Sequence, residues 1–374
     1  MLIEENKPLA PFTTFGIGGP ARWFAEAASE GDVAEAAAWA NERGVPLFVL
    51  GGGSNLLVSD AGFDGLVLRM GLRGIAISLA PDRSGQVIYE TTAGEEWNGI
   101  VERAVLADCA GIECLAGIPG TVGGTPVQNV GAYGQEVASV IERVRAFDLK
   151  ERAFIEFSAV ECGFAYRRSR FNATDRGRYV VTRVDYRLTP GGAPTVRYAE
   201  LQRAFPEDAQ PSLAEVAAAV RRLRQSKGML LVEGDPECRS AGSFFKNPVV
   251  TEEQMRAIAA GSGKEPPRFP AGPNSGSGTE NEGRVKIPAA WLIEQAGFAK
   301  GYTLGKAAIS SRHTLAIINR GGATAAEILA LASQIADTVE EKFGIRLEME
   351  PVMVGFVLSQ VSKSGKNILD SSHP

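Results

Sequence analysis

Residues 117–134 read GIPGTVGGTPVQNVGAYG and contain six glycines, two prolines and no charged residue. Glycine can adopt a positive φ and lets the backbone approach another group closely. Repeated glycines leave backbone N–H groups bare, which suits an anion such as a pyrophosphate. Gln128 and Asn129 add hydrogen-bonding groups, and the ring of Tyr133 can pack on a flat cofactor. The alternative interpretation is a buried turn system where two elements pack closely.

A second glycine-rich stretch, GGGSN at residues 51–55, lies between short predicted strands at 47–50 and 56–58. It is not a dinucleotide fingerprint, because no helix begins after the glycines to present its N-terminus to phosphates. It is not a P-loop, since no Lys-Ser or Lys-Thr follows. Its amides can still hold phosphates, or it can be a plain β-turn. We predict an α+β first half in which the two glycine-rich loops converge.

The length of 374 residues is enough for two or three domains and a large core. A composition of 44% hydrophobic and 22% charged residues is typical of soluble globular proteins. The net charge of −5 argues against a nucleic-acid partner, and no apolar run is long enough to span a bilayer. The N-terminus lacks the apolar stretch of a signal peptide, which predicts a cytoplasmic protein. No protein partner is evident.

Cysteine and histidine usage predicts that this chain has no metal site. Cys109, Cys114, Cys162 and Cys238 are scattered without a CxxC pair, so we expect buried free thiols. The two histidines, His313 and His373, are too few for a His-rich metal site or a paired-histidine proton shuttle. Difficult chemistry would therefore fall to a cofactor assisted by polar side chains.

Periodicity and helix-end signals predict the main elements. The signals are capping boxes that begin at Ser29, Ser212 and Thr324 and glycine stops at Gly297 and Gly344. Helices are expected at 30–43, 97–107, 213–227, 291–296 and from 325 to a stop at Gly344. Strands are expected within 67–89 and at 140–149, 179–188, 243–248 and 346–356.

Three of these elements place polar residues of interest. Lys227 continues the inward apolar stripe of the helix at 213–227, whereas Arg224 points elsewhere. The strand at 243–248 sets Ser243 and Asn247 on one face. The strand at 346–356 carries Glu348 and Glu350 on one face.

A Pro-Gly-Gly linker near residue 190 divides the chain into domains at 1–190 and 191–356. We expect the last helix and strand to pack back on the first domain. The Gly-, Pro- and Ser-rich stretch at 260–282 is predicted to be a mobile surface insertion, and the tail at 357–374 to be disordered.

Four motifs in one order resemble the UDP-N-acetylenolpyruvoylglucosamine reductase (MurB) family. They are GGGSNLLV at 51–58, the glycine-rich stretch at 117–134, FAYRRSRF at 164–171 and GSFFKNPV at 242–249. The resemblance runs to Phe356, and TVRYAEL at 195–201 resembles the family's first type, which keeps a tyrosine loop over the substrate.

The resemblance implies a two-part FAD-binding PCMH-type domain, like that of vanillyl-alcohol oxidase, at 1–190. A smaller α/β substrate domain follows at 191–356. It also implies noncovalent FAD that is reduced by NADPH. Hydride then passes to the enolpyruvyl group of a UDP-sugar, which gives UDP-N-acetylmuramate for peptidoglycan precursor synthesis.

The resemblance also implies roles for individual residues. Arg167 stabilises the negative charge left by hydride transfer, Ser243 donates a proton, and Glu350 polarises the same intermediate. Arg168 and Glu348 are the alternatives; the proline that usually precedes the second glutamate follows it here. The cofactor-binding positions are Gly51, Gly52, Gly53, Ser54, Asn55, Ile118, Pro119, Gly120, Gly123, Gly124, Gln128, Asn129, Gly131, Ala132, Tyr133 and Arg224. The substrate-binding positions are Tyr166, Tyr198, Lys227, Asn247 and Gln295.

Two other functions compete with the reductase. A flavin oxidase of the same superfamily often tethers FAD through histidine or cysteine. No histidine precedes His313, which leaves only Cys109 and Cys114 for such a link in the flavin domain. A non-catalytic sensor of UDP-sugars would need neither a flavin nor a proton donor.

Overall fold

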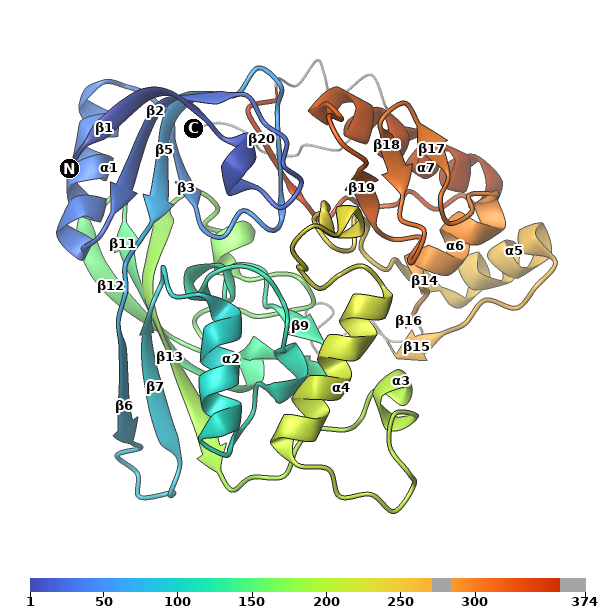
Figure 1. Cartoon of the computed structure of the whole chain (residues 1–374), viewed down its shortest axis with the longest axis horizontal. Coiled ribbons are helices and arrows are strands. Elements are labelled where there is room, and N and C mark those ends of the chain that lie inside the picture. Colours follow the sequence, from blue (N-terminus) through green and yellow to red (C-terminus); the bar gives the residue numbers. More distant parts are fainter. Residues whose placement is uncertain (271–283, 357–374) are drawn as a thin grey trace. The chain divides into compact units, whose positions relative to one another are not determined.

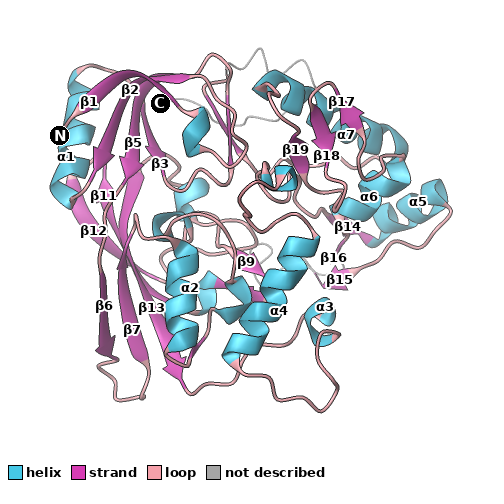
Figure 2. Cartoon of the chain, viewed as in Figure 1, coloured by secondary structure: helices cyan, strands magenta, loops and turns pink. Residues whose placement is uncertain are grey.

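The computed structural model describes residues 1–270 and 284–356, and the chain divides into two compact units (Figure 1). The first unit consists of Met1–Glu5, Trp23–Gly52 and Gly65–Ser226, and the second of Asn6–Arg22, Gly53–Asp64 and Lys227–Pro374. Helices and strands are mixed along the chain, so the predicted α+β class is confirmed (Figure 2). The predicted disordered tail and most of the predicted insertion lie outside the described residues.

The first unit contains a six-stranded antiparallel sheet in the order β12-β11-β13-β7-β6, with β8 pairing along β13. Its strands are β6 (Ile75–Leu79), β7 (Val87–Thr92), β8 (Cys109–Ala110), β11 (Ile141–Asp148), β12 (Ala153–Ser158) and β13 (Tyr179–Pro190). A short hairpin, β9 (Gly131–Ala132) and β10 (Gln135–Glu136), lies within and just after the glycine-rich stretch. The strands predicted at 140–149 and 179–188 are therefore confirmed.

A second sheet has the order β1-β2-β5-β3. Its strands are β1 (Ile3–Pro8), β2 (Pro20–Ala27), β5 (Phe63–Met70) and β3 (Leu47–Leu50). Between β2 and β3 runs α1 (Glu30–Glu42), which begins at the predicted capping box: the N–H of Asp32 donates to Ser29 Oγ at 3.2 Å. Gly44 then takes φ 62°, as a chain leaving a helix often requires.

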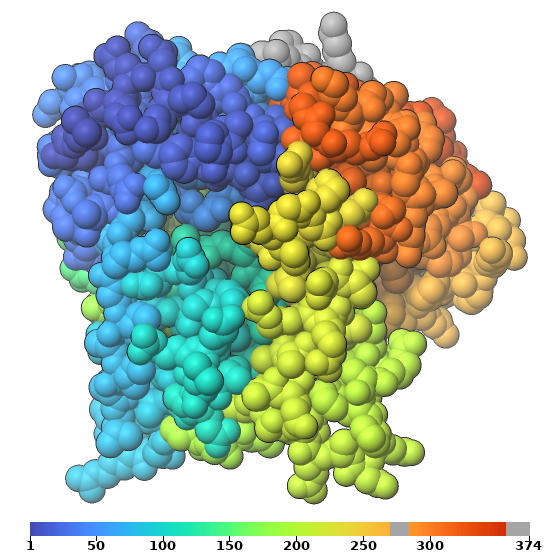
Figure 3. Space-filling view, in the orientation of Figure 1, coloured from blue at the N-terminus to red at the C-terminus, as the bar shows by residue number. Residues whose placement is uncertain are grey.

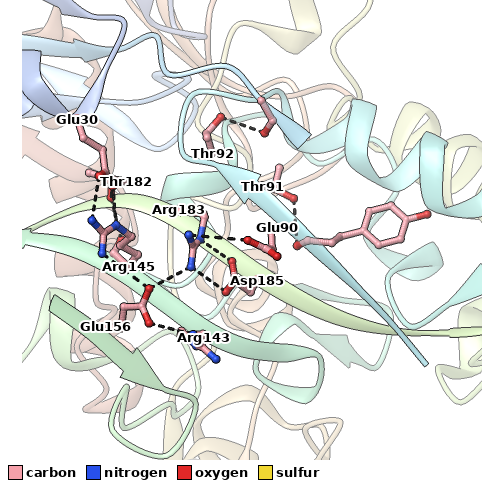
Figure 4. A network of polar contacts seen from close by, with 12 residues as sticks. Glu30, Glu90, Thr91, Thr92, Arg143, Arg145, Glu156, Thr182, Arg183 and Asp185 are labelled. Atoms are coloured by element: carbon pink, nitrogen blue, oxygen red, sulfur yellow. Dashed lines mark hydrogen bonds and ion pairs between the residues drawn. The ribbon is translucent and has the colours of Figure 1, made fainter. Parts of the chain in front are cut away.

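One face of the large sheet carries a network of charged side chains (Figure 4). Arg183 of β13 lies 2.8 Å from Asp185 on the same strand and 3.1 Å from Glu156 of β12. Arg145 of β11 lies 2.8 Å from Glu30, the first residue of α1. Burial raises the pKa of Asp185, and the ion pair with Arg183 opposes that rise. The network thus ties α1 to the sheet through charge pairs that are partly shielded from water.

The helices α2 (Trp97–Leu106) and α4 (Leu213–Ser226) lie side by side on one surface of the first unit (Figure 3). The short helix α3 (Ala199–Gln202) precedes α4. The predicted stripe of α4 is confirmed, because Leu213, Val216 and Val220 are buried. The prediction that Arg224 points away from this core is wrong. Its side chain is only 9% exposed, because its long stem reaches back to the glycine-rich stretch.

The second unit has its core around α7 (Ala325–Phe343), which packs on α5 (Glu252–Ser262), α6 (Ala289–Ala296), β18 and β19. Its strands are β4 (Leu56–Val58), β14 (Val249–Thr251), β15 (Phe269–Pro270), β16 (Arg284–Lys286), β17 (Thr303–Leu304), β18 (Ala307–Ile309), β19 (Ile317–Asn319) and β20 (Val352–Val354). The predicted capping box at Thr324 and the glycine stops at Gly297 and Gly344 are present. The described part of the predicted insertion, residues 260–270, begins in α5 and ends in β15.

Two predicted strands of the second unit are wrong. Residues 243–248 form no strand, and the predicted alternation fails because Phe244 and Phe245 are both buried. Residues 346–356 form a strand only in β20. A single bridge between Phe245 and Met349 joins the two segments. Adjacent aromatic side chains that both enter the core require an irregular backbone, which a period of two cannot describe.

The division into units differs from the boundary expected near residue 190. It falls at Ser226 and Lys227, because α3 and α4 pack on the core of the first unit. The strand β20 pairs in parallel with β4, whose residues lie within 1–190. Asp60, also within 1–190, accepts the N–H groups of Ala325 and Ala326 at the start of α7, while the body of that helix packs on elements that follow residue 190. The functional division at 1–190 and 191–356 stays a prediction. Within the described ranges, no helix has the length and apolar character needed to cross a bilayer.

Candidate functional site

The two glycine-rich loops meet in the first unit. A Cβ atom added to Gly52 would lie 2.6 Å from the Cα of Gly120, and one added to Gly51 would lie 2.8 Å from Thr121 Oγ1. Both distances are below the 3.0 Å that real Cβ contacts respect. These positions therefore require glycine while the loops stay this close, and the predicted convergence is confirmed.

Part of the stretch at 117–134 is also a packed turn system. The N–H of Gly123 donates to Ala93 O at 2.9 Å, and the N–H of Gly124 donates to Thr121 O at 3.0 Å. These two amides are therefore engaged inside the fold. Asn129 is fully buried, and its side-chain amide donates to Glu136 at 2.9 Å and to Ala165 O at 3.1 Å. Asn129 thus holds the stretch against the FAYRRSRF motif.

Two arginines converge on this stretch. Arg167 donates from Nη2 to Gly131 O at 2.9 Å and takes the left-handed φ of 54°. Arg224 donates from Nε to Gly117 O at 3.0 Å. Burial lowers the pKa of Arg224 to about 10; Tyr133 opposes this shift and the charge of Arg167 adds to it. Both groups are cations at neutral pH, so the first unit concentrates positive charge where the sequence predicts an anion.

Two candidate tyrosines also lie against each other in the first unit. The rings of Tyr133 and Tyr198 are 5.5 Å apart and perpendicular. Tyr133 is buried, whereas Tyr198 is 40% exposed. Burial raises the pKa of Tyr133 to about 12 and also raises the pKa of Tyr198. Both phenols are therefore neutral donors at physiological pH.

The other first-unit candidates flank this cluster. Tyr166 lies beneath the guanidinium of Arg167, whose carbon is 5.6 Å from the ring centroid. Arg168, the alternative to Arg167, is exposed, and its backbone pairs with Ala165. The remaining candidates are half-buried along the glycine-rich stretch: Ile118, Pro119, Gly120, Gln128 and Ala132.

In the second unit, Thr14 organises the loop that holds Gly53, Ser54 and Asn55. The N–H of Thr14 donates to Gly53 O at 3.1 Å, and its hydroxyl donates to Ser240 O at 2.6 Å. Gly53 takes φ 63°, and a Cβ there would lie 1.8 Å from Phe12 O. Thr14 was not predicted from the sequence, since no spacing pattern links it to a partner more than two hundred residues away.

The second unit also brings Asn55 and Glu350 together beside the GSFFKNPV motif. The N–H of Glu350 donates to Phe244 O at 2.9 Å, and Asn55 Nδ2 donates to Glu350 O at 3.3 Å. Ser243 is half-buried and directly precedes Phe244. The alternative, Glu348, has a largely exposed side chain that pairs with Lys246. The backbone of Glu350 is thus bonded to the GSFFKNPV motif, whereas the carboxylate of Glu348 is turned to Lys246.

The predicted substrate contacts of the second unit lie on different elements. Lys227 follows the last residue of α4, so it is not on the helical stripe where the sequence placed it. Asn247 Oδ1 accepts the N–H of Ala289, the first residue of α6, at 2.9 Å. Gln295 is half-buried near the end of α6. Asn247 therefore has a structural bond of its own, whatever else its amide contacts.

All four cysteines are buried free thiols, as predicted. Burial, with a contribution from Glu113, raises the pKa of the Cys114 thiol to about 12. A thiol that stays protonated is a poor nucleophile for a flavin link. Among the residues that the structure describes, no group of histidine, cysteine and carboxylate side chains is arranged to hold a metal ion.

Two known protein families match separate parts of the chain. The FAD binding domain family matches residues 21–152, and the C-terminal domain family of UDP-N-acetylenolpyruvoylglucosamine reductase matches residues 235–354. The reductase of Streptomyces coelicolor is 46% identical over 364 residues, covering 95% of this chain and 91% of that protein. The reductase of Thermobifida fusca is 45% identical over 365 residues, covering 95% and 99%.

A solved structure agrees with these relatives. The MurB crystal structure from Thermus caldophilus has a TM-score of 0.63 and 26% identity, covering 95% of this chain and 99% of that one. Sequence relatives and fold thus point to one family over nearly the whole chain. The chain belongs to the UDP-N-acetylenolpyruvoylglucosamine reductase family.

Proposed function

We propose that this chain uses NADPH to reduce the enolpyruvyl group of UDP-N-acetylglucosamine-enolpyruvate, giving UDP-N-acetylmuramate. As a member of its family it is a FAD-containing oxidoreductase of peptidoglycan precursor synthesis. The observation that carries the site assignment is the pair Arg167 and Arg224 on the carbonyls of the glycine-rich stretch. A bound anion stabilises a buried cation whose pKa is lowered, because its charge offsets the hydration that the cation has lost.

The residues of the first unit fit FAD. The donor set combines glycine backbone, which a cofactor can approach closely, with the cationic side chain of Arg224. Gly123 and Gly124 use their amides inside the fold, so we assign them close approach rather than hydrogen bonding. Gly51 and Gly52 pack too tightly against residues 120 and 121 to carry a side chain. When bound, FAD supplies the hydride chemistry that no side chain of this chain can perform.

Arg167 is assigned to the negative charge that hydride transfer leaves on the substrate. The guanidinium is permanently charged and forked, and its bond to Gly131 O fixes it in advance. A preorganised donor needs little reorganisation as charge develops, and such electrostatic stabilisation is usually the largest single contribution to catalysis.

Ser243 is assigned as the proton donor, and Glu350 as the group that helps to polarise the intermediate that Ser243 protonates. The support is local: Glu350 is bonded through its backbone to the residue after Ser243. A serine hydroxyl is a poor acid, so nearby positive charge or a hydrogen-bond chain must help it to release a proton.

Tyr166, Tyr198, Lys227, Asn247 and Gln295 are assigned to the UDP-sugar. Lys227 offers a point charge suited to a diphosphate, and Tyr198 offers an exposed phenol. UDP-sugar and NADPH are the partners that we propose; the absence of protein partners and the cytoplasmic location stay predictions.

The test separates the two half-reactions. The protein is reduced anaerobically with NADPH, and the enolpyruvyl substrate is then added while flavin absorbance is followed. Bleaching followed by recovery supports the reductase. In a separate aerobic assay, rapid oxygen consumption by the protein without the enolpyruvyl substrate would indicate an oxidase. Colourless protein would indicate a sensor.

Glu350→Gln and Glu348→Gln form a matched pair for the catalytic carboxylate. We expect Glu350→Gln to slow flavin reoxidation by about 10²-fold, the usual scale for a positioned acid–base group. Glu348→Gln should leave the rate within about twofold, since exposed ion pairs contribute little. The reverse order would move the assignment to Glu348.

A further inference from the structure

A fully buried carboxylate outside the assigned site, Glu113, sits where two parts of the first unit meet. It lies four residues before the glycine-rich stretch, in a 3-10 turn (Glu113–Leu115). Its Oε2 accepts the N–H of Gly111 at 2.8 Å. Its Oε1 accepts the N–H of Thr195 at 2.7 Å and the side-chain amide of Gln135 at 3.0 Å. A carboxylate accepting three N–H groups is a strong anchor, because each bond is charge-assisted.

Thr195 is held from its other side as well. The thiol of Cys114 donates to Thr195 O at 2.9 Å. Gln135 completes the group, since its Oε1 accepts the N–H of Cys114 at 2.9 Å. Thr195 is thus fixed at both its N–H and its carbonyl by a set that we call the Thr195 anchor: Glu113, Cys114 and Gln135.

The anchored residue begins the segment that carries Tyr198. Three residues further on, Tyr198 packs edge-on against Tyr133, and its N–H would lie 3.7 Å from a Cβ placed on Gly134. Gln135 directly follows Gly134. The anchor therefore binds the start of the Tyr198 segment to the end of the glycine-rich stretch.

We propose that Glu113 is a positioning residue that sets Tyr198 against the glycine-rich stretch, through Thr195. This inference rests on the proposed function, in which Tyr198 contacts the UDP-sugar. Glu113 itself is buried in the fold and is assigned no contact with substrate. If Tyr198 is ordered before the substrate binds, less conformational entropy is lost on binding. We therefore expect the anchor to affect substrate affinity.

Glu113→Gln disturbs the hydrogen bonds of the Thr195 anchor while keeping the shape of the side chain. An amide of the same shape has one oxygen and one NH₂ group, and that NH₂ would face an N–H donor on at least one side. Cys114→Ala removes the thiol that donates to Thr195 O, whereas Cys114→Ser keeps a donor at that position. Glu161→Gln is the matched control, since Glu161 also accepts a backbone N–H, that of Ser158 at 2.8 Å, but is exposed.

The first readout is amide hydrogen exchange of residues 194–201, which does not depend on any assigned function. We expect at least tenfold faster exchange in Glu113→Gln and Cys114→Ala, and normal exchange in Cys114→Ser and Glu161→Gln. Unchanged exchange in both Glu113→Gln and Cys114→Ala would overturn the proposal. The use of Cys114→Ala keeps the test valid if Glu113→Gln fails to fold.

The second readout is a double-mutant cycle on KM for the enolpyruvyl substrate. Glu113→Gln should raise KM about tenfold or more, the scale expected for losing one charge-assisted contact. Flavin reduction by NADPH should stay within about twofold of the normal rate. In a Tyr198→Ala background the further rise should vanish, because the anchor then has nothing to position. Additive effects would overturn the proposal. If Tyr198→Ala alone left KM unchanged, the assignment of Tyr198 under the proposed function would fail, and the exchange readout alone would decide the anchor.

Discussion

Replacing Gly53 by alanine tests whether close approach or backbone conformation makes this glycine necessary. Gly53 has φ 63°, and Gly44 offers a matched control with φ 62°. A Cβ on Gly44 meets nothing within 4 Å, whereas a Cβ on Gly53 would lie 1.8 Å from Phe12 O. The two alanine variants therefore share the same backbone strain and differ in the contact.

The magnitudes follow from that difference. A left-handed conformation costs an L-residue about 1–2 kcal/mol, and alanine recovers about 0.4–1 kcal/mol by restricting the unfolded chain. Gly44→Ala should thus lose about 1 kcal/mol of unfolding free energy. In Gly53→Ala the loop must also move by more than an ångström to reach the 3.0 Å limit. Such overpacking adds about 1–3 kcal/mol.

The assay combines thermal unfolding with the ratio of bound FAD to protein. At roughly 2–4 °C per kcal/mol, Gly44→Ala should lower Tm by a few degrees and Gly53→Ala by about 5–15 °C. Because Gly53 is assigned to FAD, only Gly53→Ala should lose flavin on dilution. Equal Tm values for the two variants would refute the packing argument. A less stable Gly53→Ala protein that keeps its flavin would reject the cofactor role.

Four further predictions concern single steps. Ser243→Ala should be reduced by NADPH at nearly the normal rate, whereas its reoxidation by the enolpyruvyl substrate should fall by about 10²-fold and recover partly in Ser243→Cys; in stopped-flow absorbance, equal slowing of both steps would contradict proton donation. Lys227→Ala should weaken substrate binding by about 1.5–3 kcal/mol without loss of FAD, as measured by titration, and an unchanged affinity would reject the contact. Arg224→Met removes a buried cation, so FAD affinity should fall by about ten- to a hundredfold while the FAD-free protein keeps its Tm; a drop in that Tm with normal affinity would make Arg224 structural. Acid precipitation should release all flavin to the supernatant, because Cys109 and Cys114 are buried thiols; flavin that remains in the pellet would show a covalent link.

The sequence alone predicted features whose physical cause is local. The capping boxes at Ser29, Thr324 and Ser212 and the stops at Gly297 and Gly344 were right because a cap depends on residues within one turn of each other. The apolar stripe of α4 was right for the same reason. The four motifs indicated the family that the relatives then showed.

Only the tertiary structure decided where the polar side chains go. Arg224 belongs to an exposed-looking arginine run, yet its guanidinium is buried because Gly117, more than a hundred residues earlier, supplies a carbonyl for it. Phe244 and Phe245 both enter the core, so the strand expected there does not form. Thr14 and Glu113 gain their importance from Ser240 and Thr195, which lie far along the chain. Hydrogen-bond partners of buried groups are set by which distant segments pack together, and no local spacing records that.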